Sequence, residues 1–255
     1  MSDCYNLSMI YAFLFVLGSI VGSFLNVVGL RFRSGITLGG HSSCPSCGKR
    51  LSVLELVPIL SFLFLRGRCR ECKTHISPQY PLVELWTGVI FASLYFKFGL
   101  TASYLLLTTV FCIYTVILIY DLRHKIIPDS LVYLSIALAL VYRIMVGGVW
   151  LDYLTGPILF ALFGLGWLVS RGRALGLGDG KLALSIGFLL GAPNGLSAIV
   201  MAFWIGAAVT VPLMLFSKKG ITMKSEIPFG PFLVLGAWVS LYFALDFFHV
   251  YSFIN

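Results

Sequence analysis

The feature that most constrains this chain is a series of long segments without a charged side chain. Residues 4–30, 102–120 and 182–217 contain no Asp, Glu, Lys or Arg. An α-helix needs about 20 apolar residues to cross a bilayer. Only 11% of the 255 residues are charged, against about 25% in soluble domains. The runs are also too continuous for the alternating strands of an outer-membrane barrel. The sequence therefore predicts an all-α polytopic membrane protein.

Eight transmembrane helices are predicted along the chain. The last long uncharged run exceeds one span, and Gly191-Ala-Pro-Asn-Gly195 within it is a strong turn signal. We therefore divide that run into a short and a long helix. The predicted spans are about 8–30, 81–98, 102–120, 130–147, 152–170, 181–191, 195–216 and 229–250.

The basic residues predict which side of the membrane each loop faces. Of the 18 Lys and Arg residues, 16 fall in the alternate loops 31–80, 121–129, 171–181 and 217–228. Cytoplasmic loops of membrane proteins carry this excess. We therefore expect these four loops in the cytoplasm and both termini outside. The net charge of +8 then reports topology, and we expect no nucleic-acid partner.

Four cysteines in the first of these loops have the spacing of a metal site. Cys44 and Cys47 form one C-x2-C pair, and Cys69 and Cys72 form a second pair after 21 intervening residues. Four thiolates in this pattern are typical of a closed, structural Cys4 zinc site. Disulfides are disfavoured because the cytoplasm is reducing. The alternative is four free thiols.

Two of the ten acidic residues are candidates for catalysis. Asp121 ends the third span, where the helix dipole disfavours a carboxylate by about 0.3–1 kcal/mol. Asp179 lies at the start of the sixth span, on the same predicted face of the membrane. Two such carboxylates could share a proton and activate a water molecule. The alternatives are an interfacial charge for Asp121 and a helix N-cap for Asp179.

Three other acidic residues lie at or near the ends of predicted helices. Asp129 follows Pro128 and is a suitable N-cap for the fourth span. Asp152 is expected at an outward helix end, at the interface. Glu84 falls just inside the second span, where carboxylates are rare, and its role stays open.

Six segments of the chain form a series of recognisable motifs. They are Gly18-Ser-Ile-Val-Gly-Ser-Phe-Leu-Asn-Val-Val28, the two Cys pairs, Tyr80-Pro-Leu-Val-Glu84, Tyr120-Asp121 through Ile127-Pro-Asp129, Gly176-Leu-Gly-Asp179-Gly-Lys181 and Ile227-Pro-Phe-Gly-Pro-Phe232. Together, and in this order over nearly the whole chain, they resemble the type IV prepilin peptidases, which are membrane aspartic proteases of the GxGD type in the bacterial inner membrane.

The resemblance implies removal of the basic leader of prepilins or pseudopilins at the cytoplasmic membrane boundary. It implies that Asp121 and Asp179 are the catalytic pair, supported by Asp129, Gly176, Gly178 and Lys181. It also implies methylation of the new N-terminal residue with S-adenosylmethionine as the donor. The organisation would be a first helix (1–30), a cytoplasmic zinc-binding loop with the methyltransferase region (31–80) and a seven-helix peptidase region (81–255).

Two other functions stay open from the residues alone. An ion-coupled or proton-coupled transporter also places carboxylates in broken helices, but no repeat is visible and the acids lie at the boundary. A zinc-containing membrane assembly factor without catalysis is the other alternative. Membrane lipid is an expected partner. The oligomeric state and the residues that bind the methyl donor do not follow from the sequence.

Overall fold

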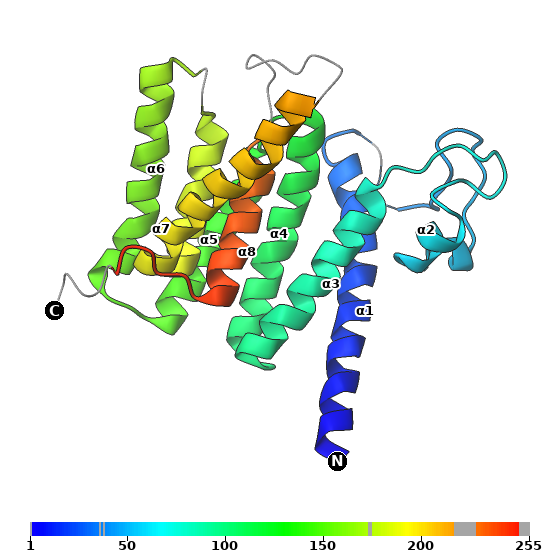
Figure 1. Cartoon of the computed structure of the whole chain (residues 1–255), viewed down its shortest axis with the longest axis horizontal. Coiled ribbons are helices and arrows are strands. Elements are labelled where there is room, and N and C mark those ends of the chain that lie inside the picture. Colours follow the sequence, from blue (N-terminus) through cyan, green and yellow to red (C-terminus); the bar gives the residue numbers. More distant parts are fainter. Residues whose placement is uncertain (1, 36, 38, 173–174, 217–227, 250–255) are drawn as a thin grey trace. The chain divides into compact units, whose positions relative to one another are not determined.

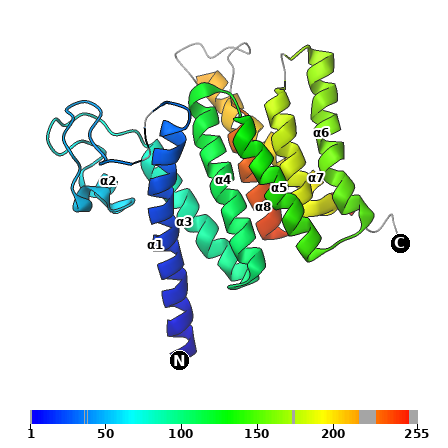
Figure 2. The ribbon, with the colours of Figure 1, turned by 180° about the vertical axis from the view of Figure 1, so that it is seen from behind.

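The computed structural model describes residues 2–35, 37, 39–172, 175–216 and 228–249, and these residues form helices and loops without a β-strand. Figure 1 shows the helices and Figure 2 shows them from behind. The chain divides into two compact units, Met1–Thr108 and Thr109–Asn255. The all-α prediction is confirmed for the described part of the chain.

The first unit is built on two long helices that pack closely. Helix α1 spans Ser2–Arg31 and α3 spans Gln79–Phe98. A Cβ atom at Gly18 would lie 2.7 Å from the Thr87 carbonyl oxygen, and one at Gly22 would collide with the Thr87 hydroxyl. Glycines four residues apart allow helices in a membrane to approach to this degree. The Gly-x-x-x-Gly segment therefore packs α1 against α3.

The loop between α1 and α3 holds the 3-10 helix η1 (Val53–Leu56) and the short helix α2 (Leu60–Phe64). Its two Cys pairs are each flanked by an isolated antiparallel bridge, Ser43 to Arg50 and Arg68 to His75. The predicted polar insert is thus an irregular loop with two short helices.

Helix α4 spans Ala102–His124 and leads into the second unit. There α5 spans Asp129–Val146, α6 Trp150–Ser170, α7 Leu177–Phe216 and α8 Gly230–Phe243. The core includes Tyr114, whose hydroxyl lies 2.8 Å from the Ser185 hydroxyl. Five of the described helices are long and apolar enough to cross a membrane, namely α1, α4, α5, α6 and α7. The protein is therefore a multi-pass membrane protein.

The break in the long uncharged run falls where the turn signal predicts it. Helix α7 is interrupted at Gly191, which has φ 74°. Arg143 donates to the carbonyl oxygens of Phe188 and Leu189, and Asp152 accepts the Ala192 N–H at 2.8 Å. Asp152 lies in the first turn of α6, at a helix end as the sequence predicts, and its side chain is only 2% exposed because it is buried against the break in α7. It satisfies backbone groups that the break in the helix leaves without partners.

The last predicted span is too long. Helix α8 ends at Phe243, and Ala244 takes a left-handed conformation with φ 51°. The following segment turns back, so that the Phe247 N–H donates to the Ser197 hydroxyl in α7. No glycine or proline marks this end of the helix in the sequence. The end of α8 is determined instead by tertiary contacts with α7. Residue 250, the predicted end, and most of the basic loop 217–228 lie outside the described residues.

Candidate functional site

Asp121 lies near the end of α4 and is only 3% exposed. Its Oδ2 atom accepts a hydrogen bond of 3.1 Å from the backbone N–H of Gly230, the first residue of α8. The first N–H groups of a helix have no partner within it, and they carry the positive end of its dipole. The N-terminus of α8 therefore offsets the unfavourable position of this carboxylate at the end of its own helix.

Asp179 is the third residue of α7, and its Oδ2 atom accepts the backbone N–H of Gly176 at 3.2 Å. Its alternative interpretation as an N-cap is wrong, because the helix already begins at Leu177. The side chain instead reaches back to the residue that precedes the helix, as the acidic residue of a capping box does. Asp179 is thus fixed at the positive end of α7.

The two carboxylates lie in the same unit, on segments that meet at Ile127. Ile127 packs between Gly178, the neighbour of Asp179, and Gly230, the hydrogen-bond partner of Asp121. A Cβ atom added at Gly178 would lie 3.0 Å from the Ile127 Cβ, and one added at Gly230 would lie 3.6 Å from its Cδ1. Three distant segments therefore converge here, and each of the two acids is held by a backbone N–H at the N-terminus of a helix.

Asp129 and Lys181 form an ion pair beside this site. The Lys181 Nζ lies 2.7 Å from the Asp129 Oδ1 and 5.2 Å from the centre of the Tyr133 ring. The N-cap interpretation of Asp129 is wrong, because Pro128 holds the cap position and Asp129 is the first helical residue. The Asp129 carboxylate therefore joins α5 to α7 through Lys181, which lies two residues after Asp179.

Gly230 is the residue of this site that the sequence did not single out. A Cβ atom there would lie 2.6 Å from the Asp121 Oδ2, so only glycine fits the observed contact. The signal available was its place in Pro228-Phe-Gly-Pro231, where a proline marks the start of a helix. That signal predicted the helix and not its contact with an acid 109 residues earlier.

The four cysteines of the loop come together. The sulfur atoms of Cys44, Cys47, Cys69 and Cys72 all lie within 4.8 Å of one another, and those of Cys44 and Cys72 are 3.8 Å apart. In a tetrahedral site with Zn–S bonds of about 2.3 Å, the sulfurs are about 3.8 Å apart. The four thiols are therefore close enough together for one tetrahedral metal ion to bind all of them.

The two Cys pairs adopt matching backbone turns. The Cys44 N–H donates to the Lys49 carbonyl at 2.9 Å, and the Cys69 N–H donates to the Thr74 carbonyl at 2.9 Å. The residue after each second cysteine, Gly48 or Lys73, has a positive φ of 71° or 58°. A left-handed residue at this position turns the chain so that both sulfurs of a pair face the same point.

Without a metal, the pKa values of Cys72 and Cys47 are shifted in opposite directions. The hydrogen bond to the Thr74 hydroxyl at 3.2 Å lowers the pKa of Cys72 to about 6. The Lys49 backbone also lowers the pKa of Cys47, but burial and the other three sulfurs raise it to about 11. Metal binding releases protons from such thiols.

Glu84 has a structural contact that answers part of the open question about its role. Its side chain is buried in α3, and its Oε2 atom accepts the backbone N–H of Ile59 at 2.7 Å. This bond ties the start of α2 to α3. Asn26 supports the same region by donating to the Tyr80 carbonyl at 3.3 Å.

Comparison with known proteins gives consistent matches along the chain. Residues 16–98 match the model of the bacterial peptidase A24 N-terminal domain, and residues 106–211 match the model of the type IV leader peptidase family. Curated relatives named prepilin leader peptidase/N-methyltransferase align over most of their length. The relative from Burkholderia pseudomallei is 31% identical over 93% of this chain and 86% of its own. The relative from Bacillus subtilis is 30% identical over 88% and 90%. No solved structure matches.

Proposed function

Because this chain belongs to the type IV leader peptidase family, we propose that it removes the leader peptide of prepilins or pseudopilins and N-methylates the new N-terminal residue. The relatives' names carry both activities. The chain covers most of their length, so the two activities belong to one protein. The transporter and the non-catalytic assembly factor are not favoured.

The observation that supports the peptidase assignment is that the segments carrying Asp121 and Asp179 converge at Ile127, with each carboxylate held by a backbone N–H at a helix N-terminus. Two carboxylates that interact at short range can share one proton. The ionised carboxylate would take a proton from a water molecule while the oxygen of that water attacks the scissile carbonyl carbon. The protonated partner would then give its proton to the departing amine. This assigns the chemistry of an aspartic endopeptidase to the pair.

The supporting residues of the site have distinct proposed roles. Gly176 holds the Asp179 carboxylate through its backbone N–H, and Gly178 leaves room for the Ile127 side chain against the start of α7. Asp129 and Lys181 hold α5 against α7 through their 2.7 Å ion pair. None of these side chains needs to exchange protons with the substrate.

We place the protein in the bacterial inner membrane with eight spans. Eight helical segments of the described residues could form these spans. They are the seven helices α1 and α3–α8, with α7 counted as two because it is broken at Gly191. The excess of basic residues in alternate loops supports a cytoplasmic face for the loop 31–80 and for the aspartate pair. The organisation follows as a first helix (1–30), a loop with the methyltransferase region (31–80) and a peptidase region (81–255).

The four-cysteine site is proposed to hold structural zinc. The sulfur spacing fits tetrahedral coordination, and four protein ligands leave no open position for catalysis. Zinc would supply a cross-link between the two Cys pairs, which are 21 residues apart. The methyl donor is proposed to be S-adenosylmethionine. The described residues contain no strand followed by a glycine-rich loop and a helix, so we assign no residue to this donor.

The direct test is incubation of the purified protein with a prepilin in lipid. Mass spectrometry of the substrate should show loss of the leader and, with S-adenosylmethionine present, addition of one methyl group. A substrate that remains intact with the well-folded protein would refute the assignment. Ion uptake by proteoliposomes without cleavage would favour the transporter instead.

A further inference from the structure

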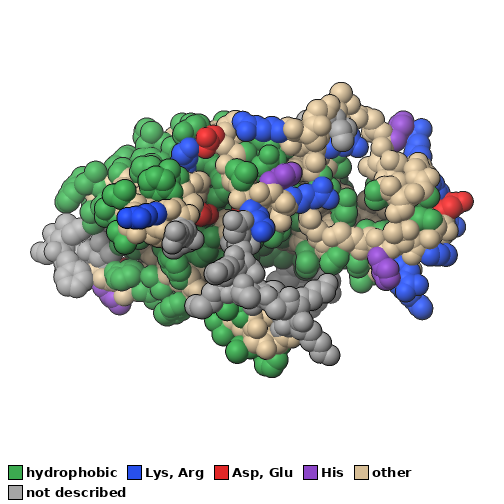
Figure 3. Space-filling view, turned by 90° about the horizontal axis from the view of Figure 1, so that it is seen from above, with side chains coloured by type: hydrophobic (Ala, Val, Ile, Leu, Met, Phe, Trp, Pro, Cys, Tyr) green, Lys and Arg blue, Asp and Glu red, His purple; other side chains and the backbone are tan. Residues whose placement is uncertain are grey.

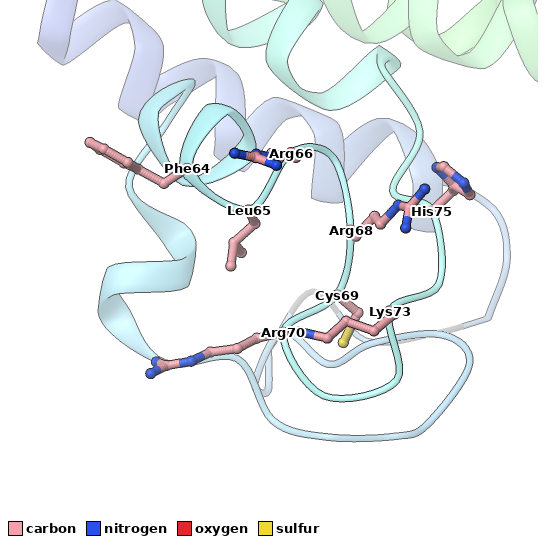
Figure 4. Close-up of a pocket in the computed structure, with 8 residues that line it drawn as sticks. All are labelled: Phe64, Leu65, Arg66, Arg68, Cys69, Arg70, Lys73 and His75. Atoms are coloured by element: carbon pink, nitrogen blue, oxygen red, sulfur yellow. The ribbon is translucent and has the colours of Figure 1, made fainter.

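The loop between α1 and α3 exposes a group of large apolar side chains on its two short helices. Val53 and Leu54 of η1 are 83% and 77% exposed, and Leu63 and Phe64 of α2 are 62% and 84% exposed. Figure 4 shows the Phe64 ring extending outward from the end of α2. An exposed apolar group of this kind marks an interaction surface.

The orientation of these side chains is determined by the fold of the loop. The Gly67 N–H donates to the Phe62 carbonyl at 2.9 Å and closes the end of α2. The Phe62 ring packs against Gly67, where a Cβ atom would lie 2.9 Å from the ring. Phe62 therefore faces inward, which turns Leu63 and Phe64 away from the protein.

Helix α2 lies beside a membrane helix and not beyond its end. Its N-cap residue Ile59 donates to Glu84, and Gly22 of α1 packs against the backbone of Glu84, with an added Cβ 3.0 Å from its Cα. Gly22 lies nine residues before Arg31, the end of the candidate span Ser8–Arg31. At 1.5 Å per residue this is about 13 Å along the helix. Figures 1 and 2 agree that α2 lies alongside α1.

Basic side chains surround the end of α2. These basic residues are Arg66, Arg68, Arg70, Lys73 and His75. Together with Phe64, Leu65 and Cys69 they line a cavity of about 450 Å³. Figure 4 shows them on the segment that follows α2. In the view of Figure 3, Lys, Arg and His side chains gather over this loop. The cavity therefore offers positive charge directly next to the exposed apolar residues.

We propose that this loop is a membrane-interface anchor whose partner is a monolayer of anionic phospholipid. Leu63 and Phe64 insert among the acyl chains, and the basic cavity takes lipid phosphate groups. Two observations select lipid over a protein partner. The helix lies at the depth of a membrane span, and apolar residues flanked by basic ones are typical of interfacial segments. The inference does not depend on either enzymatic activity.

Hydrogen exchange of the full-length protein in nanodiscs tests this proposal. Amide exchange of residues 53–66 should be slower in discs that contain phosphatidylglycerol than in phosphatidylcholine discs. Phe64→Ser should abolish this protection. Arg66→Gln should reduce it about fivefold, as expected for the loss of one basic residue near an anionic surface. Arg50→Gln is the matched control, because Arg50 is an exposed basic residue of the same loop outside the cavity, and it should leave the protection unchanged.

Three results would overturn the proposal. Equal exchange in both kinds of disc would exclude recognition of anionic lipid. Equal protection in Phe64→Ser and wild type would exclude insertion of α2. Protection in detergent that rises with protein concentration would identify a second copy of the chain as the partner. Unchanged zinc content in the variants shows that the loop is still folded, so that a loss of protection reports lipid binding.

Discussion

The backbone N–H of Gly230 donates a 3.1 Å hydrogen bond to the Oδ2 atom of Asp121, although the two residues are 109 positions apart. The N-terminus of α8 thus points at the buried carboxylate of Asp121, which lies near the C-terminal end of α4. The bond requires a residue without a side chain, because a Cβ atom at Gly230 would lie 2.6 Å from the same oxygen. This relationship leads to the first prediction.

Gly230→Ala should reduce the rate of leader cleavage by about 10- to 100-fold. The methyl group would displace either α8 or the carboxylate, and a hydrogen bond to a charged group contributes about 1.5–3 kcal/mol. The measurement is kcat/KM for prepilin cleavage. Gly164→Ala is the matched control, because nothing lies within 4 Å of an added Cβ there. A variant at Gly230 with wild-type kinetics would argue against the role of this bond.

Asp121→Asn and Asp179→Asn should each lower cleavage by at least about 100-fold, since general acid–base groups contribute about 100- to 10,000-fold. Asn retains the shape of the side chain and removes its ionisation. The assay is leader removal by protein that inserts into the membrane normally. The control is Glu71→Gln, because the Glu71 side chain is exposed. Asp152→Asn is unsuitable as a control, because Asp152 is buried at the break in α7. Robust cleavage by either Asn variant would refute the catalytic pair.

Lys181→Ala should reduce cleavage only a few-fold. The ion pair with Asp129 is partly exposed, with side-chain exposures of 25% and 57%, and such pairs contribute about 1 kcal/mol or less. Asp129→Asn should have a smaller effect, because its amide oxygen still accepts the Lys181 hydrogen bond. Loss of activity in Lys181→Ala as severe as in the Asp121 variant would show that Lys181 acts in the chemistry itself.

Cys44→Ser should remove bound zinc and most methyl transfer while leaving part of the cleavage activity. The loop has little apolar core, and structural zinc supplies about 10–16 kcal/mol of apparent binding free energy in small metal-folded peptides. Metal analysis and mass spectrometry of the cleaved product measure the two effects. Cys112→Ser is the control, because Cys112 lies in α4 outside the cluster. Wild-type protein without zinc would refute the metal assignment, and complete loss of cleavage in a well-inserted Cys44 variant would refute the separation of activities.

The loop that holds the cysteines should be inaccessible to membrane-impermeant thiol reagents added from outside the cell. A cysteine at Ser46 should remain unlabelled, whereas one at Leu100, which is 75% exposed in the turn between α3 and α4, should react. Both are tested in a chain without Cys4 and Cys112. The reverse pattern would invert the topology. The companion loop site at Arg173 lies outside the described residues.

The sequence alone was sufficient for the local and repetitive features of this protein. Continuous apolar runs predicted the helices, because a helix in lipid must satisfy its own backbone and can do so from local residues. The turn signal at Gly191–Gly195 predicted the break in α7. The C-x2-C pairs predicted that four sulfurs would meet, because the spacing of each pair already forms a local turn.

Tertiary structure decided what each polar group meets. Asp129 and Asp179 are reasonable N-caps by local rules, but a lysine from α7 and the chain before α7 take their carboxylates instead. Asp152 is buried because a broken helix needs its acceptor. The partner of Asp121 comes from Gly230, and no local pattern links residues so far apart. Side-chain spacing encodes helices, whereas the pairing of buried charges depends on which helix ends the packed bundle brings together.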